Sequence, residues 1–479
     1  MQGMEEIRKI LEKQPNLKKK ELDFIEKAFF FSEKAHKEQK RYSGEPYFNH
    51  IVRSTVNLLD FKVDKETIAG ALLHDVVEDC GVSIETIRQE FGEDVASLVS
   101  GVSKLGTIKY RGRERYAENM RHLFLAIADD IRILLIKLAD RLDNVRTLEH
   151  VPEHKRERIA LETLEVYVPL ANRLGMGRLK SALEEASFKF AHPKEYNKVT
   201  ALIKEKGRER ERYINKVFKS LSKQFAKVGI KDAHVSYRIK DTYSIYKKLL
   251  KKDMDVAKIY DMYALRVTVP KVEDCYQVLG VIHKLWKPLP GRIKDYIANP
   301  KVNGYQSLHT TVFIGDGGIA EIQVRTEQMH IDAEYGIAAH LLYKGDLKNK
   351  KEERLNWLTY VRKLNEENHE SEDFLKNLTL DLFDKRIFLF TPLGDVIELP
   401  EKASALDFAY AIHSDIGHHT SGVRINGKLV TLDTKLKNGD IVEVQTNKNS
   451  KPTRKWLDYA NTSFARRYIK SYLKQETRE

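Results

Sequence analysis

The sequence predicts a multidomain protein of the α+β class, in which an all-helical region precedes two regions that contain strands. A chain of 479 residues is long enough for about three domains. Apolar residues recur at helical spacing in the first part of the chain, strand-like alternation begins after residue 230, and a shorter alternating region starts at residue 386. These changes divide the chain into the expected segments 1–195, 196–340, 341–385, 386–446 and 447–479.

Composition narrows the class of protein further. Hydrophobic residues make up 42% of the chain, which is enough for packed cores, and charged residues make up 32% with a net charge of +13. Most of this charge is typical of a solvated surface, but the excess favours anionic partners such as nucleotides or nucleic acid. The two cysteines, Cys80 and Cys275, exclude a disulfide framework. Without a signal peptide or a run of 18 apolar residues, we expect a cytoplasmic protein and no membrane partner.

The segment 1–195 is expected to be almost entirely helical. Leu22, Ile25 and Phe29 recur at helical spacing, and so do Ile131, Leu135 and Leu138. The charged stretch 200–228 is also helical in pattern, and we expect it to connect the first domain to the second.

Strand signals dominate the segment that follows. Apolar and polar residues alternate at 264–269, 309–314 and 319–324, and the glycine-rich residues 315–318 suit a hairpin turn. These features predict a mixed sheet with helices. Residues 341–385 are charged and are expected to form a helical linker, 386–446 a small β unit, and the basic residues 447–479 the start of a helical region.

A candidate metal site stands out in the helical region. His74 and Asp75 are adjacent, His50 lies upstream, and Asp140 lies downstream. Two imidazoles and two carboxylates suit a divalent transition metal that keeps positions open for water. Such a metal lowers the pKa of water enough for phosphate hydrolysis near neutral pH. These residues therefore predict a metal-dependent phosphohydrolase.

The residues around this cluster strengthen the prediction. Glu78 lies four residues after His74, and Asn144 lies four residues after Asp140, so each pair is expected to share a helix face. Several ionisable groups so close together would be costly to bury without a metal or a partner. We therefore expect the neighbouring apolar residues to face the core while these groups face one cleft: His74, Asp75, Glu78 and Asp79.

A second candidate site lies in the mixed-sheet segment. Arg238 and Lys240 share one side of an extended stretch, where they could clamp a polyphosphate. Asp261 precedes one predicted strand and Glu321 lies in another, so two carboxylates could hold a magnesium ion with a triphosphate. One of the two could also act as a base toward a ribose hydroxyl. Taken alone, these features indicate a nucleotide-binding α/β domain.

The first site resembles a known enzyme family. The segments Arg41-Tyr-Ser-Gly-Glu-Pro-Tyr-Phe-Asn-His50 and His74-Asp-Val-Val-Glu-Asp79 are similar to the hydrolase domain of RelA/SpoT-type enzymes, which belongs to the HD superfamily of metal-dependent phosphohydrolases. The resemblance implies a manganese ion bound by His50, His74, Asp75 and Asp140. It also implies that Glu78 and Asp79 position or activate water, and that Arg41 and Asn144 contact the nucleotide.

Two positions depart from the pattern of this family. Asp143 stands where a histidine is expected, and Ile51 follows His50 where proline is usual. Neither change removes an implied ligand. Asp143 adds negative charge near the site and could alter the affinity for substrate.

The second site resembles the nucleotidyltransferase-like synthetase domain of the same family, through Arg-Ile-Lys-Asp at 238–241, Gly-Tyr-Gln-Ser-Leu-His at 304–309 and Glu-Ile-Gln-Val-Arg-Thr at 321–326. The resemblance implies transfer of pyrophosphate from ATP to the 3′ hydroxyl of GDP or GTP. Asp261 and Glu321 would bind magnesium, and Glu321 would activate the hydroxyl. The implied nucleotide contacts are Arg238, Lys240 and Lys301 for phosphates, Tyr305 for guanine, and Asn303, Gln306 and His309 for the acceptor.

Three further positions in this segment bear on the prediction. Gln323 shares a face with Glu321 and is expected to contact nucleotide, the alternative being a solvent-facing strand residue. The basic Arg-x-Lys-Asp segment is typical of bifunctional family members, whereas synthetase-only members carry an acidic version. Tyr237 stands where glycine is common.

The segment 386–446 resembles a TGS domain, a small β-grasp fold, most strongly at 407–418. In long members of the family this domain reads the end of an uncharged tRNA on the ribosome, and further regulatory domains usually follow. The resemblance makes His418, and less directly His413, candidates for RNA contact. The alternative is that these histidines only support a turn.

The residues and the resemblance together predict a bifunctional enzyme of the stringent response. It would act as a GTP/GDP pyrophosphokinase that makes (p)ppGpp and as a 3′-pyrophosphohydrolase that returns ppGpp to GDP and pyrophosphate. We expect the two activities to be antagonistically coupled, because running both would waste ATP. Two alternatives remain: a hydrolase whose synthetase-like domain only senses nucleotide, or a regulator that acts mainly by binding tRNA or the ribosome.

Overall fold

The computed structural model describes most of the chain, in two compact units. The described residues are 17–103, 121–122, 124–230, 232–239, 241–250, 263–301, 303–314, 318–341 and 386–476, with the single residues 5, 7, 8, 11, 12 and 365. Within them, the side chains of 206–214, 238–239, 263, 340–341 and 386 are not described. One unit comprises residues 1–107 and 129–356, and the other comprises 108–128 and 357–479. The expected linker 341–385 therefore lies almost wholly outside the described residues.

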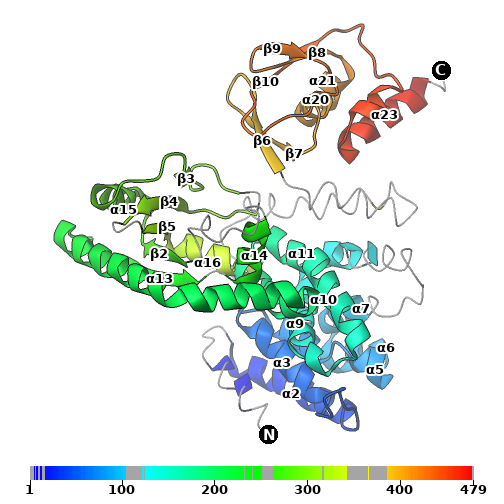
Figure 1. The fold of residues 1–479 in the computed structure, drawn as a ribbon. Helices are drawn as coiled ribbons and strands as arrows, with labels where there is room; N and C mark the ends of the chain where they lie inside the picture. Colours follow the sequence, from blue (N-terminus) through cyan, green and yellow to red (C-terminus); the bar gives the residue numbers. More distant parts are fainter. Residues whose placement is uncertain are drawn as a thin grey trace. The chain divides into compact units, whose positions relative to one another are not determined.

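The N-terminal part of the first unit is helical, as predicted (Figure 1). Its α-helices are α2 (Lys19–Ala35), α3 (Phe48–Leu59), α4 (Lys65–Leu72), α5 (Val76–Cys80), α6 (Ile84–Phe91), α7 (Glu93–Ser103), α9 (Ile131–Arg146), α10 (Glu153–Glu162), α11 (Val168–Arg173) and α12 (Gly177–Ala191). A 3₁₀ turn, η1 (Leu148–His150), follows α9, and a π-helical segment, η2 (Thr163–Tyr167), joins α10 to α11.

Helix α9 lies at the centre of this helical region. Asp130 caps its N-terminus by accepting a hydrogen bond from the backbone N–H of Arg132. Leu134, Leu135 and Leu138 are fully buried at the helical spacing expected from the sequence. The helix packs against α3, α7 and α12. It therefore presents its polar residues from a rigid, well-packed element.

Helix α4 ends two residues before His74, contrary to one expectation. Leu73, His74 and Asp75 form a turn, and α5 begins at Val76. The pairing of His74 with Glu78 on one helix face is therefore wrong. Leu72, Leu73 and Val76 are buried as expected, but Val77 is only half-buried and Glu78 and Asp79 are exposed, so these two acids do not share the buried setting of His74.

The second part of the first unit contains a five-stranded mixed sheet. The strands are β1 (His234–Ile239), β2 (Tyr263–Val269), β3 (Lys294–Asp295), β4 (Leu308–Phe313) and β5 (Ile319–Thr326), in the order β1-β2-β5-β4-β3. Strands β2 and β5 are parallel, and the other neighbours are antiparallel. The helices of this part are α13 (Pro193–Val228), α14 (Thr242–Leu250), α15 (Val272–Leu285), α16 (Glu327–Tyr335) and α17 (Ile337–Leu341).

One core joins this sheet to α13, α14 and α15. Leu265 and Val267 of β2 and Ile322 and Val324 of β5 are fully buried in it. Alternation therefore directs Arg266, His309, Glu321 and Gln323 to the opposite face of the sheet. The prediction of a mixed sheet whose strands alternate between buried and more exposed residues is therefore confirmed.

Helix α13 is more than the connector that we expected. It runs without a break from Pro193, so the expected boundary after residue 195 falls in its first turn. Val217, Leu221 and Phe225 are buried in the core of the sheet. Figure 1 shows this long helix running alongside the sheet. It is thus a structural part of the second domain.

The helical and sheet parts of this unit touch through their backbones. The N–H of Ile337 donates to the carbonyl of Leu174 at 3.0 Å. Gly336 has a φ of +57°, and a Cβ at this position would overlap that same carbonyl oxygen. Only glycine meets both conditions easily.

The second unit contains the small β region. Its elements are β6 (Arg386–Phe390), β7 (Val396–Pro400), α20 (Ala405–Ile412), α21 (Ser414–His418), β8 (Thr420–Ile425), β9 (Lys428–Val430), β10 (Val442–Thr446), α22 (Trp456–Tyr459) and α23 (Ser463–Glu476). Strands β6 and β7 form a hairpin, and β10, β8 and β9 form a three-stranded sheet in that order. Helix α23 packs against α20 around Tyr410 and Trp456.

Among the described helices of both units, none has the length and apolar character to cross a membrane.

Candidate functional sites

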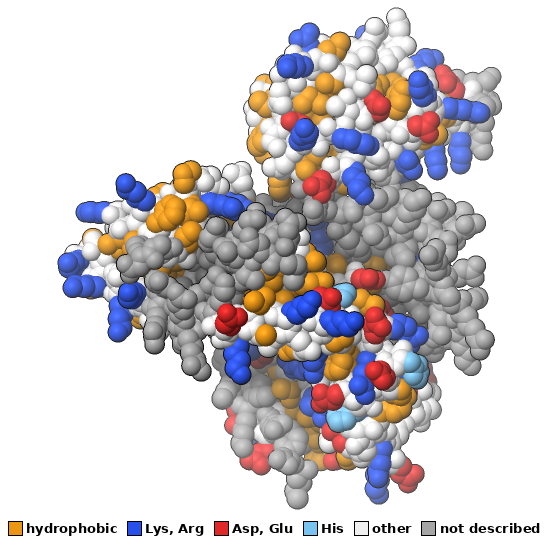
Figure 2. Space-filling model, viewed as in Figure 1, with side chains coloured by type: hydrophobic (Ala, Val, Ile, Leu, Met, Phe, Trp, Pro, Cys, Tyr) orange, Lys and Arg blue, Asp and Glu red, His pale blue; other side chains and the backbone are white. Residues whose placement is uncertain are grey.

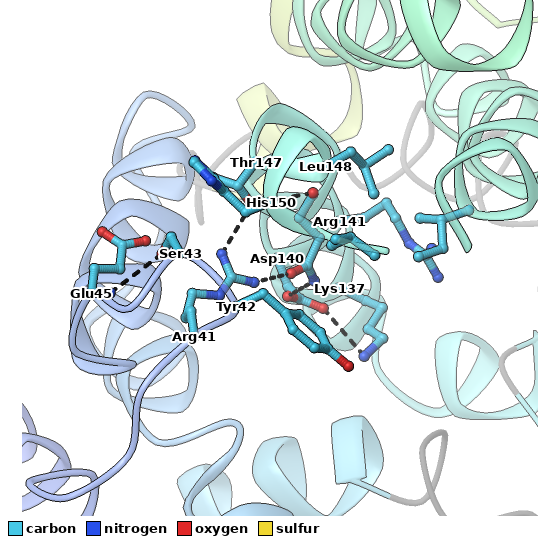
Figure 3. Close-up of a pocket in the computed structure, with 13 residues that line it drawn as sticks. Arg41, Tyr42, Ser43, Glu45, Lys137, Asp140, Arg141, Thr147, Leu148 and His150 are labelled. Atoms are coloured by element: carbon cyan, nitrogen blue, oxygen red, sulfur yellow. Dashed lines mark hydrogen bonds and ion pairs between the residues drawn. The ribbon is translucent and has the colours of Figure 1, made fainter. Parts of the chain in front are cut away.

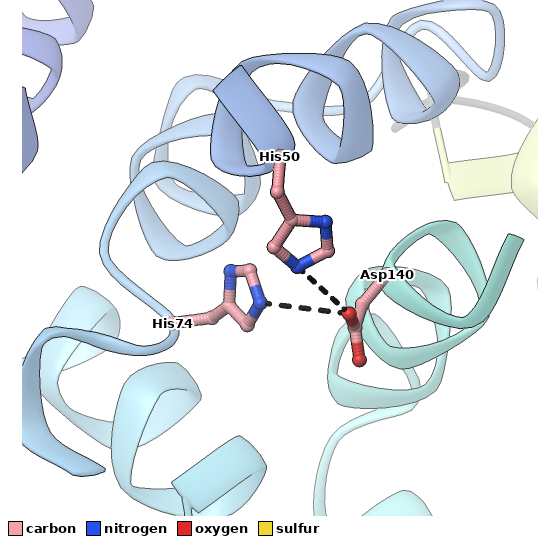
Figure 4. Close-up of side chains that lie close together, drawn as sticks. All are labelled: His50, His74 and Asp140. Atoms are coloured by element: carbon pink, nitrogen blue, oxygen red, sulfur yellow. Dashed lines mark ion pairs between the residues drawn. The ribbon is translucent and has the colours of Figure 1, made fainter. Parts of the chain in front are cut away.

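Three of the predicted metal ligands converge from separate elements (Figure 4). His50 comes from α3, His74 from the turn after α4, and Asp140 from α9. Their candidate ligand atoms all lie within 4.8 Å of one another. Asp75 joins them, because its Oδ2 is 3.1 Å from His74 Nε2 and 3.9 Å from His50 Nε2. The four predicted ligands are thus brought together.

The two histidines are held in the way that metal ligands usually are. Nδ1 of His74 is 2.7 Å from the carbonyl oxygen of Ala71, and Nδ1 of His50 is 2.7 Å from Asp143. Each ring can therefore donate through Nδ1 and present an unprotonated Nε2. His74 is 1% exposed, and its Nε2 has no hydrogen-bond partner among the described residues. A buried nitrogen facing two carboxylates fits a divalent cation.

The pKa values of this cluster reflect its excess of negative charge. Burial alone would lower the pKa of His74, but Asp75 and Asp140 raise it to about 9. Burial would also lower the pKa of His50, but the hydrogen bonds of His50 with Asp140 and Asp143 raise it above its usual value. Burial would raise the pKa of Asp140, yet Lys137 and His50 hold it well below its usual range. The carboxylates thus attract positive charge, which a metal ion would supply in place of protons.

Glu78 and Asp79 lie beside this cluster on α5. Partial burial of their carboxyl groups raises the pKa of both, and the negative charge of Asp75 adds to this effect. Lys137 acts in the opposite direction on Glu78. A carboxylate with a raised pKa is a better proton acceptor than an ordinary one. Either residue can therefore take a proton near the metal ligands.

A pocket of about 210 Å³ adjoins the metal ligands and shares Asp140 with them (Figure 3). Arg41 lies at this pocket and donates to Thr147 Oγ1 at 3.0 Å and to Asn144 Oδ1. Asn144 in turn donates to Asp140 Oδ1 at 2.6 Å. The two predicted nucleotide contacts, Arg41 and Asn144, therefore connect the pocket to the metal ligands.

Several residues of this pocket were not predicted from the sequence. Lys137 lies 3.3 Å from Asp140, and Arg141 packs on the ring of Tyr167 with its guanidinium 4.2 Å from the ring centre. Both line the pocket, as does Thr147. The helical spacing that paired Asp140 with Asn144 also places Lys137 and Arg141 on that face of α9, so the signal was present. These cations make the pocket suitable for a polyanion.

The predicted synthetase site lies on the face of the mixed sheet that is opposite the core. Glu321 Oε1 accepts a hydrogen bond from Gln323 at 2.9 Å and lies 3.6 Å from His309 Nδ1. The hydroxyl of Tyr305 is 2.8 Å from His309 Nε2, and Lys301 Nζ lies 4.9 Å from the centre of the Tyr305 ring. Five predicted residues thus form one chain of contacts. The Tyr305 ring, which lies beside His309 and Lys301, is an aromatic surface on which a nucleotide base could stack.

Two other predicted residues of this site are engaged elsewhere. Asn303 donates to the backbone oxygen of Asn172 at 3.0 Å, and Gln306 donates to that of Ile297 at 3.1 Å. Asp261, Lys240 and the side chain of Arg238 lie outside the described residues. Sequence reasoning missed Tyr296, whose ring stacks edge-on against His309 with centroids 5.2 Å apart. A tyrosine among bases in 291–309 was the available signal.

The two candidate RNA-binding histidines have structural partners in the second unit. His413 caps α21, accepting from the backbone N–H of Asp415 at 3.2 Å. His418 Nδ1 is 3.1 Å from the hydroxyl of Tyr410, and its ring contacts Tyr468 and Tyr472. Burial lowers the pKa of His418. These contacts favour the alternative in which both histidines support local structure.

Three family profiles match separate parts of the chain. One described as an HD domain matches residues 28–177, one described as a region found in RelA / SpoT proteins matches 237–348, and one described as a TGS domain matches 387–446. HD and synthetase domains imply the use of divalent metals, which agrees with the cluster of His50, His74 and Asp140.

Curated relatives match nearly the whole chain. The guanosine-3′,5′-bis(diphosphate) 3′-pyrophosphohydrolase of Aquifex aeolicus is 44% identical over 95% of this chain, and the protein of the same name from Vibrio cholerae is 41% identical over 97%. The bifunctional (p)ppGpp synthase/hydrolase SpoT of Escherichia coli is 42% identical over 95%. This chain spans 65%, 67% and 65% of those three proteins, respectively.

Among solved structures, the small alarmone synthetase 2 of Bacillus subtilis is 25% identical to this chain. The match covers 34% of this chain and 94% of that protein, with a TM-score of 0.25. The profile matches and the identity to these relatives show that the chain belongs to the RelA/SpoT family.

Proposed function

We propose that this chain is a bifunctional enzyme that hydrolyses ppGpp at the helical site and synthesises (p)ppGpp at the sheet site. The observation that carries the proposal is that each site gathers the residues that its chemistry needs. Four candidate metal ligands adjoin a cationic pocket, and Glu321 lies next to His309, which contacts Tyr305 and, through the Tyr305 ring, Lys301. A relative named as bifunctional supports the combination.

For hydrolysis, the pocket would orient the 3′ diphosphate of ppGpp. Lys137, Arg141 and Arg41 supply positive charge, and Asn144 holds Arg41 beside Asp140. Glu78 or Asp79 would accept a proton from the attacking water, whose oxygen bonds to phosphorus as the bond to the ribose 3′ oxygen breaks. The ribose oxygen then takes up a proton, which yields GDP and pyrophosphate.

A divalent ion, which we propose to be manganese, would supply the Lewis acid for this reaction. The residues that would hold it are His50, His74, Asp75 and Asp140.

For synthesis, the ribose 3′ oxygen of GDP or GTP would attack the β-phosphorus of ATP, and AMP would leave. Glu321 is the proposed acceptor of the hydroxyl proton, and Gln323 and His309 hold its carboxylate in place. Tyr305 presents its ring for stacking on guanine, with Lys301 beside it for phosphate. Glu321 and Asp261 would hold magnesium, which would neutralise the charge of the triphosphate.

The proposal is tested by two incubations of the purified chain. One contains labelled ATP with GDP or GTP, and the other contains labelled ppGpp with manganese, with the nucleotides resolved afterwards. Products in both reactions are expected. Hydrolysis with no synthesis, even though the sheet site binds nucleotide, would instead support the nucleotide-sensor alternative.

We also propose that the second unit contacts tRNA or the ribosome, as the TGS match suggests. Exposed basic residues support this, including Lys428, Lys435 and Lys437 near the small sheet and Arg466 and Lys470 on α23. Figure 2 shows Lys and Arg side chains on the visible face of this unit.

We expect uncharged tRNA to bind in a filter assay, with an affinity that falls as salt rises because counterions are released from the phosphates. Replacing Arg466 and Lys470 with glutamine should weaken binding and flatten the salt dependence. The matched control replaces Lys19 and Lys20, which are exposed on α2 of the other unit. Equal binding by both variants would contradict a role for α23.

The two sites are proposed to be antagonistically coupled through α12. Glu185 of α12 accepts from the backbone N–H of Thr242 at 3.0 Å, and so caps α14, which follows the predicted phosphate clamp. Glu184 of α12 also pairs with Lys247 of α14 at 2.6 Å. On its other side α12 packs against α9, which carries Asp140. One helix thus contacts α9 of the helical site and α14, the helix that follows the predicted clamp of the sheet site.

A non-hydrolysable ATP analogue with GDP is therefore expected to weaken ppGpp binding at the helical site by about 5- to 150-fold, the usual range of such coupling. Calorimetry with and without the analogue measures this factor. Thermodynamic reciprocity requires that ppGpp weaken analogue binding by the same factor. Glu185→Gln, which weakens the cap on α14, should reduce the coupling. Unchanged ppGpp affinity would contradict the idea.

A further inference from the structure

Asp143 lies directly behind the candidate metal ligand His50. Its Oδ2 is 2.7 Å from His50 Nδ1, on the side of the ring away from the metal cluster. The same Oδ2 accepts from Arg41 at 3.1 Å, and Oδ1 accepts from Nε of Arg53 at 2.7 Å. Asp143 is 2% exposed. One buried carboxylate therefore joins a candidate metal ligand to an arginine of the pocket.

The charge of Asp143 is balanced by the arginines. Arg53 also donates to both carboxylate oxygens of Glu45, at 3.0 and 2.8 Å, and so is fixed from two sides. A buried carboxylate compensated by Arg41 and Arg53 can stay ionised, which makes it a strong hydrogen-bond acceptor for the ring N–H of His50. The arrangement is that of a carboxylate–histidine pair behind a metal.

The two imidazoles of the site are held by different kinds of hydrogen-bond partner. His74 is anchored through Nδ1 by a backbone carbonyl, which no side-chain substitution removes. His50 depends on a side chain, and its other neighbour, Ser54 Oγ, is farther away at 3.3 Å. Asp143 lies three residues after Asp140 on α9, so one turn of this helix provides both a ligand and the residue that holds another ligand.

We propose that Asp143 is a positioning residue of the hydrolase site. It holds His50 in the tautomer and ring orientation that direct Nε2 toward Asp140 and Asp75. Through the same oxygen it fixes Arg41 at the pocket. The metal-binding part of this inference stands on the geometry alone, and the Arg41 part rests on the proposed hydrolysis of ppGpp.

The test compares Asp143→Ala and Asp143→Asn with the unchanged full chain. Binding of Mn²⁺ is titrated by electron paramagnetic resonance, and the hydrolase site is defined as the part of the isotherm that His74→Ala removes. Asp143→Ala is expected to raise the Mn²⁺ dissociation constant by about 10- to 100-fold, the usual effect of losing such a partner. Asp143→Asn keeps an oxygen that can accept from His50, so it should lose less. Ser54→Ala is the control and should bind Mn²⁺ within about 2-fold of the unchanged chain.

The circular dichroism spectrum and the unfolding temperature of each variant report whether the chain is still folded. Unchanged Mn²⁺ affinity in a folded Asp143→Ala chain would overturn the inference, and so would an equal loss in Ser54→Ala. Because this measurement needs no hydrolysis, it also separates the two ideas. Weakened Mn²⁺ binding in a chain that never hydrolyses ppGpp would support the positioning role and reject the proposed reaction. A raised KM for ppGpp at saturating Mn²⁺ would further support the contact with Arg41.

Discussion

His74→Ala is expected to lower ppGpp hydrolysis about 1,000-fold or more while leaving (p)ppGpp synthesis close to its original rate. His74 is buried, and its Nε2 faces Asp75 and Asp140 without a hydrogen-bond partner among the described residues. Without this nitrogen a divalent ion would lose one of its four candidate ligands. Metal catalysis contributes several kcal/mol of charge stabilisation, and each 1.36 kcal/mol corresponds to tenfold in rate.

The measurement assays both reactions on the same preparation. Retained synthesis shows that the chain is folded, so the loss of hydrolysis can be assigned to the site. His154→Ala is the matched control, because His154 is exposed on α10 and outside the pocket. Hydrolysis by His74→Ala within tenfold of the unchanged chain would show that the reaction does not depend on a metal at this cluster.

The metal cluster could be predicted because the side chains of histidine and aspartate are themselves common metal ligands. An adjacent His-Asp pair, a second histidine and a later aspartate supply the mixed N and O ligands that a divalent transition metal accepts, and the structure brings all four together. The role of Asp143 could not be predicted in this way. The sequence shows an added charge three residues after Asp140, but only the packing of α3 against α9 shows that the charge faces Nδ1 of His50.

Two local expectations were wrong because contacts in the folded chain, and not the local sequence pattern, decided the structure. A continuous helix through His74 was expected from the spacing of its neighbours, but the chain turns there, and the Nδ1 of His74 meets the carbonyl of Ala71 as α4 ends. The stretch 200–228 was expected to be a connector because it is rich in charged residues, especially at 204–212. Its buried apolar residues, such as Leu221 and Phe225, lie on one face of α13 and pack against the sheet.

The sheet site was predicted in part. Strand alternation correctly placed Glu321 and Gln323 together, because side chains two residues apart share a face. The same reasoning could not show that Asn303 turns to the backbone of Asn172 in the helical part, since that contact joins residues far apart in the sequence. Long-range contacts of this kind are decided by the packing of the two parts and not by local pattern.

Glu321→Gln is expected to lower (p)ppGpp synthesis about 1,000-fold and to leave ppGpp hydrolysis unchanged. The substitution keeps the size of the side chain and the hydrogen bond from Gln323, but it removes the negative charge and the proton acceptor. A positioned base contributes roughly 100- to 10,000-fold to a reaction of this type. With GDP or GTP as the varied substrate, the loss should appear in kcat, because Tyr305 and Lys301, which are proposed to bind this nucleotide, are untouched.

Initial rates of AMP release and of (p)ppGpp formation from ATP and GDP measure this effect, and nucleotide binding is followed separately by calorimetry. Glu273→Gln is the matched control, since Glu273 is exposed in the first turn of α15. If Glu321→Gln binds nucleotide but makes no product, Glu321 acts in the chemical step, and the sheet domain is a catalyst. Synthesis at the original rate would show instead that another group accepts the proton. The substitution keeps the size of the side chain, so it tests the negative charge and the proton-accepting oxygen of Glu321 and not its shape.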